Sequence, residues 1–425
     1  MSPDSLAALN LTTSRSSPRR VLIFCPNLVG DAVMATPTLR ALRQGWPEAR
    51  LFGVAKPVVA ATLKGLHELD EWFVFNPQAG FRATLGLIRS LRAQQFDLAV
   101  LLPNSLRSAL LAWLSGARRR IGYNRGGRQV VPWLLTDRLD PPRDPATQRF
   151  TPTPIVGYYL RLAEALGCPR GSTRLSLMVE AHDQAALERV LSRLNLGGSE
   201  RQLVVFNTGG AFGPAKSWPS ARFAALGRRL VETNDGRCDV LVMCGPAERE
   251  EAQAIVRQAA HPRVRSLDEG GEPLGIGLSK ACVRRADLLV TTDSGPRHFA
   301  AALNRPVLTL FGPTGITWTV TQHPLAWHLY QPQPCQPCQQ RVCPLGHHRC
   351  MTELSVDAVY RVCQRVLGWR EPPTTGQPRG RDRPFLPILS RESPTTLERT
   401  TSIQTAVFSG GVHLADRNAE GRPPQ

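Results

Sequence analysis

Lysine is scarce in this sequence. It occurs only at Lys56, Lys64, Lys216 and Lys280, which leaves 48 arginines among the 52 lysine and arginine residues, spread over nearly every segment. The net charge of +18 is therefore most simply a basic, solvated surface. Because lysine and arginine are not interchangeable at a phosphate or at a buried position, each of the four lysines is a candidate for a specific role.

Long apolar runs and aromatic residues are also scarce. No run approaches the roughly 18 residues of a membrane-spanning helix, and the start, MSPDSLAALNLTTSRSSPRR, lacks the basic-then-apolar order of a secretory signal. Aromatic residues make up 6% of the chain, and the arginines lack the interleaved aromatic side chains on which single-stranded nucleic acids stack. We therefore expect a cytoplasmic protein that binds no nucleic acid. The charge of +18 keeps a basic nucleic-acid-binding protein as an alternative.

The 425 residues suffice for two or three domains with full cores. Two series of short apolar runs alternate with amphipathic stretches, the first at 21–25, 50–55, 72–75 and 97–102, the second at 203–207, 239–244, 287–292 and 307–311. This alternation is typical of βα units around parallel sheets. It predicts two doubly wound, Rossmann-like α/β domains, at 19–185 and 200–369, that face each other across a cleft.

The two ends of the chain differ in composition from the rest. Residues 1–18 are rich in Ser, Thr and Pro, and residues 370–425 are rich in Ser, Thr, Arg, Gly and Pro. Their apolar content is too low to offset the entropy lost on ordering, so we expect a disordered lead and a disordered tail. One apolar segment of the tail, FLPILS, is a candidate to dock on the folded part.

The first candidate site residues follow the first predicted strand. The chain runs from VLIFC into PNLVGDAVMATP, which places Gly30 and Asp31 at the carboxyl end of that strand, where the next helix begins. In open parallel sheets, ligands bind at this edge. Asp is also a favoured helix N-cap, so Asp31 either contributes to a ligand site or only caps the helix.

The second predicted domain has two glycine-containing loops at strand ends. TGGAFGPAKSWP contains Gly209 and Gly210 ahead of Lys216. Glycines let backbone N–H groups approach an anion, and a lysine supplies a mobile positive charge; an ordinary turn with a surface lysine is the alternative. DLLVTTDSGPRHFAAAL contains the second loop, with the candidate residues Asp293, Ser294, Gly295, Pro296 and His298. Two such loops in one domain predict a site for a nucleotide diphosphate.

Single residues of these loops also have simpler interpretations. Asp293 and Ser294 could cap the following helix, and His298 could be an ordinary helix histidine. Glu248 follows the strand DVLVMC, where an acidic residue takes ribose hydroxyls in dinucleotide folds. Glu248 equally fits a surface carboxylate near a helix start.

The ten cysteines are spread along the chain, which argues against a disulfide framework. Four of them have the spacing C-x2-C-x4-C-x6-C, with two histidines inside: Cys335, Cys338, Cys343, Cys350, His347 and His348. Four thiols within sixteen residues can hold zinc, but zinc sites usually pair two knuckles across a longer spacer. The cluster is thus a structural metal site, a disulfide or a set of free thiols. A redox or metal-sensing protein built on it is a further alternative.

Taken in order, several motifs resemble the family 9 glycosyltransferases, and among them the lipopolysaccharide heptosyltransferases: VGDAVMATP, FGPAKSWP, TTDSGPRHFAAAL, LFGPT and CQPC...CPLGHHRC. The resemblance covers about residues 20–368. It implies a GT-B fold, ADP-heptose as donor, a heptose of the lipid A-linked inner core as acceptor, and inversion at the anomeric carbon without a metal or cofactor. We expect a monomer, peripheral to the inner membrane. A family 9 transferase with another nucleotide sugar or acceptor is the alternative.

The resemblance also implies roles for individual residues. Asp31 would be the general base, with Asn27 and Gly30 on the acceptor side. Lys216 and the loop Asp293–His298 would hold the donor diphosphate. Two departures are the start NTGGAF before GPAK, and Arg297 in place of a small or apolar residue. The stretch SALLAWLSGARRR, at 108–120, is either a membrane-docking surface or a core helix followed by a strand.

Overall fold

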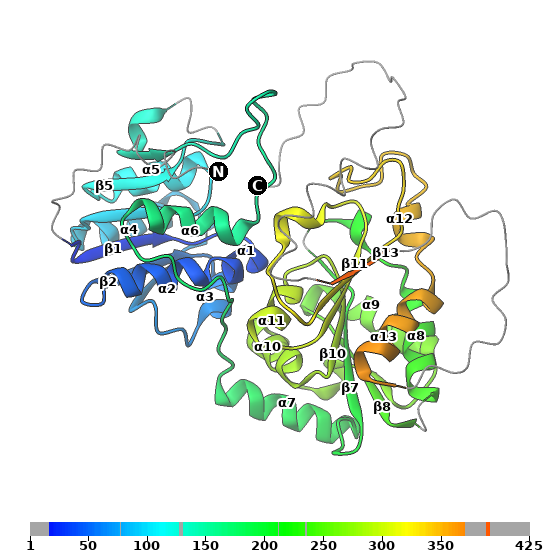
Figure 1. The fold of residues 1–425 in the computed structure, drawn as a ribbon. Coiled ribbons are helices and arrows are strands. Elements are labelled where there is room, and N and C mark those ends of the chain that lie inside the picture. Colours follow the sequence, from blue (N-terminus) through cyan, green and yellow to red (C-terminus); the bar gives the residue numbers. More distant parts are fainter. Residues whose placement is uncertain are drawn as a thin grey trace.

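The computed structural model describes residues 17–76, 78–126, 131–210, 212–233, 236–369 and 388–391. Its polypeptide forms two lobes, each built around one sheet with helices packed against it (Figure 1). Nearly all of the expected lead and tail, at 1–18 and 370–425, lies outside the described residues.

The first sheet is entirely parallel, with the order β3-β2-β1-β4-β5-β6. Its strands are β1 (Arg20–Phe24), β2 (Arg50–Ala55), β3 (Glu71–Val74), β4 (Leu98–Leu101), β5 (Arg119–Tyr123) and β6 (Asp137–Leu139). The helices of this lobe are α1 (Val29–Met34), α2 (Thr36–Gly45), α3 (Pro57–Leu63), α4 (Gly80–Ala93), α5 (Leu106–Leu114) and α6 (Ile155–Ala165), with the short helix η3 (Pro132–Leu134).

The second sheet has the order β13-β12-β11-β10-β7-β8-β9, and its six strands β7 to β12 are parallel. The strands are β7 (Gln202–Asn207), β8 (Cys238–Met243), β9 (Val264–Ser266), β10 (Leu288–Thr292), β11 (Val307–Phe311), β12 (Ala326–Tyr330) and the antiparallel β13 (Ile388–Arg391). The helices are α7 (Ala181–Leu194), α8 (Ser220–Glu232), α9 (Arg249–Ala259), α10 (Ile276–Arg285), α11 (Pro296–Ala302), α12 (Arg349–Thr352) and α13 (Val356–Leu367). Among the described residues, this lobe also contains the 3-10 helices η4 (Pro214–Lys216), η6 (Pro246–Glu248), η7 (Leu267–Gly270) and η8 (Ile316–Thr319).

Both halves therefore repeat one topology. Counted within each half, the parallel strands follow the order 3-2-1-4-5-6, in which the direction of strand addition across the sheet reverses beside the first strand. Strands buried on both faces explain the continuous apolar runs of the sequence; all six residues of β8, for example, are buried. The predicted doubly wound α/β class is confirmed.

The eight predicted strands are confirmed to within one residue at each end. The strands that sequence reasoning missed are β5, β6, β9, β12 and β13, which are short or carry polar residues such as Arg119 and Asp137. β13 corrects the expectation of disorder for four residues of the tail. It contains the last three residues of FLPILS, and backbone pairing with β12 orders it.

The lobes touch through α1 on α11 and α3 on α10. Lys280 of α10 is fully buried, and its Nζ donates hydrogen bonds to the backbone oxygens of Ala61 (3.3 Å) and Thr62 (3.2 Å), near the end of α3. Burial lowers the pKa of Lys280, and the nearby Asp183 and Glu180 oppose this effect. A charged group of the second lobe thus satisfies carbonyl groups at a helix end of the first.

We expect Lys280→Met to lower the free energy of unfolding by about 1–3 kcal/mol, because the methionine leaves the carbonyls of Ala61 and Thr62 buried without this donor. Urea unfolding followed by tryptophan fluorescence measures the loss. Lys64→Met is the matched control, since Lys64 pairs with Glu180 on the surface, and it should leave stability unchanged. Equal stability of the two variants would show that the buried lysine does not connect the lobes.

Candidate functional site

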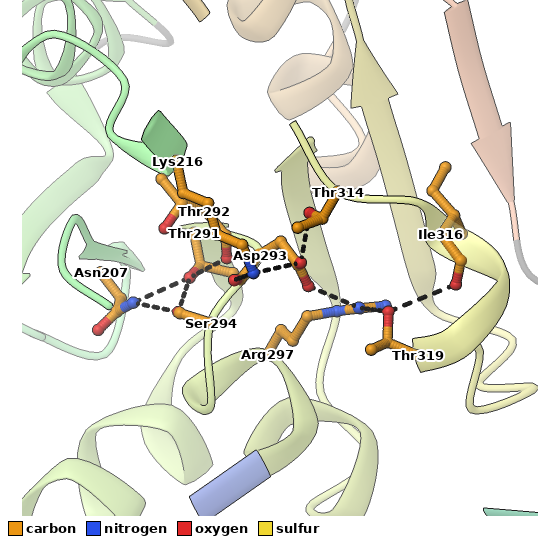
Figure 2. A network of polar contacts seen from close by, with 10 residues as sticks. All are labelled: Asn207, Lys216, Thr291, Thr292, Asp293, Ser294, Arg297, Thr314, Ile316 and Thr319. Carbon is orange, nitrogen blue, oxygen red and sulfur yellow. Dashed lines mark hydrogen bonds and ion pairs between the residues drawn. The ribbon is translucent and has the colours of Figure 1, made fainter. Parts of the chain in front are cut away.

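Polar side chains gather at the carboxyl ends of β7 and β10. Between these two adjacent strands, the direction in which strands are added across the second sheet changes. The register pairs Asn207 directly with Thr291. The Asn207 amide Nδ2 donates to Thr291 Oγ1 at 2.9 Å and to Ser294 Oγ at 2.8 Å (Figure 2). These bonds fix the start of the loop after β10, at the edge where ligands bind in open sheets.

Asp293, the first residue after β10, is the centre of the network in Figure 2. Lys216 Nζ, from the turn η4, donates to Asp293 Oδ2 at 2.7 Å and to the Asp293 backbone oxygen at 2.9 Å. Arg297 donates to Oδ1 at 3.1 Å, and Thr314 donates to Oδ2 at 2.7 Å. One buried carboxylate therefore ties together the loops that follow β7, β10 and β11.

The charge state of Asp293 follows from these partners. Burial alone would raise its pKa, but the charges of Lys216 and Arg297 and the hydrogen bonds from Lys216 and Thr314 hold the pKa of Asp293 far below its usual range. Asp293 is therefore a permanent anion and is unsuited to accepting a proton. Two cations around one carboxylate leave a net positive charge at this strand edge.

Arg297 is the main residue of this network that sequence reasoning did not assign to the site. It is buried, and its Nη1 also donates to Thr319 Oγ1 at 2.7 Å, while the guanidinium lies 4.9 Å from the Phe311 ring centroid. Its unusual position in the DSGP motif was the available signal. Asn207 and Thr314 were missed as well, although each is a polar residue directly at or shortly after the end of an apolar strand.

Asp31 comes from the other lobe. It is the third residue of α1, whose N-cap is Leu28, so the interpretation of Asp31 as the cap is wrong. The neighbouring Gly30 is buried against α11: a Cβ at position 30 would lie 2.8 Å from His298 Cδ2 and 3.3 Å from Gly295 Cα. This close approach of the two backbones brings the loop after β1 next to the loop after β10.

The pKa of Asp31 reports the same proximity. Burial and the negative charge of Asp293 raise the pKa of Asp31, the positive charge of Lys216 opposes both, and the net result is a pKa of about 6. Asp31 also acts on Tyr159 of α6, whose pKa is raised by burial and by this charge. A carboxyl group with a pKa near 6 can both hold and release a proton near neutral pH.

The remaining predicted donor-side residues lie close to one another. Glu248 accepts a hydrogen bond from the backbone N–H of Gly245 at 2.8 Å, and it closes so tightly on Gly209 that a Cβ there would overlap the carboxylate. A Cβ at Gly210 would lie 3.3 Å from Ser294 Cβ. The structure therefore brings Gly209, Gly210, Glu248 and Ser294 together.

Other predicted residues have plainer positions. Pro296 opens α11, and Gly295 is its N-cap, so the interpretation of Asp293 and Ser294 as caps is wrong. Asn27 lies exposed between β1 and α1, outside the network of Figure 2. The side chain of His298 is buried behind Gly30. The four clustered cysteines line one cavity beside Ala215, which precedes Lys216 in the chain.

Comparisons with known proteins agree with this arrangement. Residues 84–349 match the model of glycosyltransferase family 9 (heptosyltransferase). Lipopolysaccharide heptosyltransferase 2 of Salmonella typhimurium is 30% identical over 319 residues, covering 71% of this chain and 84% of that protein. The corresponding protein of Escherichia coli is 29% identical over 310 residues, covering 71% and 84%.

Solved structures show the same fold. A family 9 glycosyl transferase from Veillonella parvula has a TM-score of 0.71 at 20% identity, covering 82% of this chain and 97% of that one. The ADP-heptose lps heptosyltransferase II of E. coli has a TM-score of 0.64 at 25% identity, covering 82% and 98%.

We expect Asp293→Asn to lower the free energy of unfolding by about 3 kcal/mol or more, because it leaves the cations of Lys216 and Arg297 without their buried anion. Urea unfolding at neutral pH measures this loss. Glu232→Gln, which breaks the exposed pair of Arg228 and Glu232, is the control and should change little. A stability loss below about 1 kcal/mol in Asp293→Asn would contradict the central role of this ion pair.

Proposed function

Because this chain belongs to glycosyltransferase family 9, the heptosyltransferase family, we propose that it transfers heptose from ADP-heptose to a heptose of the lipopolysaccharide inner core. Its two facing α/β lobes are the GT-B architecture expected from the resemblance. The donor and acceptor in this proposal are supported by relatives named for the same chemistry.

The main support for the proposal is that a proton acceptor of one lobe and a positively charged edge of the other lie together at the lobe junction. The first lobe contributes Asp31, whose raised pKa suits it to take a proton. The second contributes Lys216 and Arg297 around Asp293, a positively charged edge suited to a diphosphate. A transfer between a sugar hydroxyl and a nucleotide sugar needs both groups within reach of one reacting carbon.

In the proposed reaction the acceptor hydroxyl oxygen attacks the anomeric carbon on the face opposite the diphosphate. Asp31 takes the hydroxyl proton as the new carbon–oxygen bond forms, since an un-ionised sugar hydroxyl is a poor nucleophile. The bond from the anomeric carbon to the diphosphate oxygen breaks, and ADP leaves with the electron pair. One displacement of this kind inverts the configuration at the anomeric carbon.

The leaving diphosphate carries developing negative charge, which the second lobe is suited to stabilise. Lys216 Nζ directs two of its three hydrogens to Asp293, and its side chain is 13% exposed, so the ammonium can also donate to a phosphate oxygen while Arg297 and Thr314 hold Asp293. We propose that this positive charge replaces a metal ion in the transfer step. In this proposal, Asp293 holds the Lys216 side chain in place before the donor binds.

The remaining residues complete the proposed donor and acceptor sides. We expect the backbone N–H groups of Gly209, Gly210, Ser294 and Gly295 to bind the diphosphate, with Pro296 and His298 following in α11. Glu248, held by the N–H of Gly245, accepts from the ribose hydroxyls. Asn27 and Gly30 lie beside Asp31 on the acceptor side, where Asn27 is exposed.

We also propose that the protein docks on the inner membrane at its cytoplasmic face, where a lipid-linked acceptor is presented. No helix among the described residues is long and apolar enough to cross a membrane. The helix α5 instead leaves one face exposed, and with η3 it forms an apolar surface of Leu106, Leu110, Trp113 and Trp133. Of the three arginines that follow α5, only Arg118 is exposed, because Arg119 pairs with Asp137 and Arg120 binds backbone oxygens.

Incubation of the protein with ADP-heptose and heptose-bearing lipid A core in anionic vesicles tests the function. We expect a product heavier by one heptose, detected by mass spectrometry, with ADP released in equal amount. Flotation of the protein with the same vesicles tests docking. Transfer from another nucleotide sugar, with none from ADP-heptose, would favour a different family 9 activity.

Asp31→Asn should lower kcat by roughly 100-fold or more, because the amide cannot accept the hydroxyl proton. Its melting temperature at neutral pH should be unchanged or higher. Because the pKa of Asp31 is raised to about 6, ionisation of Asp31 lowers the stability of the fold as pH rises through about 6. Asparagine resembles the uncharged form and avoids this loss. Asp140→Asn, on the surface of the same lobe, is the control. An active, stable Asp31→Asn enzyme would exclude Asp31 as the base.

Lys216→Ala should weaken ADP binding by about tenfold or more, the scale of a hydrogen bond to a charged group. The loss should shrink as salt rises, because a partly exposed contact is screened. Calorimetric titration with ADP at two salt concentrations measures both effects. Lys64→Ala, an exposed lysine of the other lobe, is the control and should bind ADP normally. Unchanged affinity in Lys216→Ala would argue against its contact with the diphosphate.

A further inference from the structure

The segment from Cys335 to Cys350 connects β12 to α12 and contains four of the ten cysteines. Before α12 begins at Arg349, it has turns and bends but no helix or strand. All four thiols are free of disulfides in the described structure. The transfer reaction proposed above uses none of them, so their presence together needs a separate explanation.

The four cysteines, 335, 338, 343 and 350, line a single small cavity. Its walls also include Ala215 and Pro313, which belong to the loops that carry Lys216 and Thr314. Cysteine residues that come from sixteen consecutive positions and border one cavity form a potential set of metal ligands. The spacing of the cysteines in the sequence does not show this shared cavity; the fold does.

The segment buries little apolar surface of its own. Its two large apolar side chains, Val342 and Leu345, are 67% and 62% exposed. A stretch that buries so little apolar surface does not recover the entropy lost on ordering. Small, loop-rich segments of this kind are usually held by disulfides or by a bound metal ion.

The two histidines of the segment have other partners. His348 Nε2 contacts the backbone oxygen of Ala215 at 2.7 Å, and His347 Nδ1 accepts the N–H of Arg349 at 3.0 Å. The Cys343 sulfur accepts the N–H of His348 at 3.4 Å. A backbone N–H directed at a sulfur is the usual support of a metal-bound thiolate. Each of these histidine contacts uses one ring nitrogen; we choose the four sulfurs as the ligand set because four thiolates complete a tetrahedral site by themselves.

We propose that Cys335, Cys338, Cys343 and Cys350 bind one zinc ion through four thiolates. Four sulfur ligands in a tetrahedron suit zinc above magnesium or calcium. On binding, each thiol releases its proton to solvent, and the zinc ion forms four bonds to sulfur without any change in oxidation state. The inference goes beyond the glycosyl transfer and does not depend on it.

Binding requires the cavity to contract. A tetrahedral site with zinc–sulfur bonds of about 2.3 Å places its sulfurs about 3.8 Å apart. Among the described residues, the group of three such ligand atoms that lie within 4.8 Å of one another is instead Glu180, His182 and Asp183. That group is a surface cluster in which Lys64 already pairs with Glu180. The cysteine side chains must therefore move closer together when the ion binds.

The zinc site would support the turn that carries Lys216. The backbone oxygen of Arg341 accepts a hydrogen bond from the Ala215 N–H at 3.0 Å. The segment therefore contacts Ala215 at both its N–H and its carbonyl oxygen. Gln336 Nε2 donates to the Gly312 oxygen at 2.7 Å, and Gln339 N–H donates to the Pro313 oxygen at 2.9 Å. The ion thus acts on the donor side as a positioning element that touches neither substrate nor product.

The test is metal analysis of the purified full chain by mass spectrometry, followed by cobalt titration after chelation. We expect about one zinc ion per chain, and cobalt in its place should show sulfur-to-metal charge-transfer bands and the intense visible bands of a tetrahedral site. Thermal melting should fall on chelation and recover with zinc, while added magnesium should have no effect.

The variants Cys338→Ser and Cys343→Ser should lose most of the bound zinc and the cobalt bands. Cys168→Ser, a buried cysteine of the first lobe, is the matched control and should keep both. If a loop variant does not fold, the cobalt titration of the chelated wild-type protein still decides the question. Failure to take up zinc or cobalt, or fewer than ten reactive thiols after denaturation without reductant, would overturn the proposal, the latter by showing a disulfide.

Discussion

The buried contact between Asp293 and its two cations is the interaction on which the second lobe's functional edge depends. Asp293 directly follows β10, Lys216 ends the turn after β7, Arg297 is the second residue of α11, and Thr314 follows β11. Each of these loops would otherwise be free to choose among many conformations. A desolvated carboxylate that needs all of its hydrogen bonds removes that freedom, because any missing partner leaves an uncompensated charge.

The same ion cluster acts across the junction between the lobes. Gly30 and Gly295 allow the backbones of α1 and α11 to approach, and this brings Asp31 into the field of Asp293 and Lys216. Burial disfavours the charge on Asp31, and the anion of Asp293 adds to that effect. The pKa of this carboxyl group is thereby shifted toward neutral pH, although a carboxylate is ordinarily a very weak base. The arrangement assigns opposite protonation behaviour to two aspartates: one is kept ionised by its partners, and the other is readily protonated.

Much of this architecture could be predicted from the sequence, because strands buried on both faces leave continuous apolar runs such as those of β7, β8 and β10. Those runs also located the loops that carry Asp31, Lys216 and Asp293. The short strands β5 and β9 were missed because Arg119, Arg120 and Arg265 interrupt their apolar character. The antiparallel β13 was unexpected, since its order comes from pairing with β12 and not from its own composition.

The candidate site was predictable as a set of loops but not as a network. Spacing alone cannot show that Arg297 turns inward to Asp293, or that Asn207 lies opposite Thr291, since both depend on the register of β10 against β7. The capping interpretation of Asp31 failed because α1 begins two residues before it. Likewise, the cysteine spacing left metal, disulfide and free thiols open, and the shared cavity beside Ala215 became visible only in three dimensions.

We infer that Asp31 of one lobe and the Lys216–Asp293 pair of the other form a single electrostatic site. Carbon-13 NMR titration of the Asp31 carboxyl group, assigned with Asp31→Asn, tests it most directly. We expect a midpoint near pH 6 in the wild type, and a higher midpoint in Lys216→Met, where the opposing positive charge is gone. A midpoint near 4 that does not change in Lys216→Met would contradict the claim.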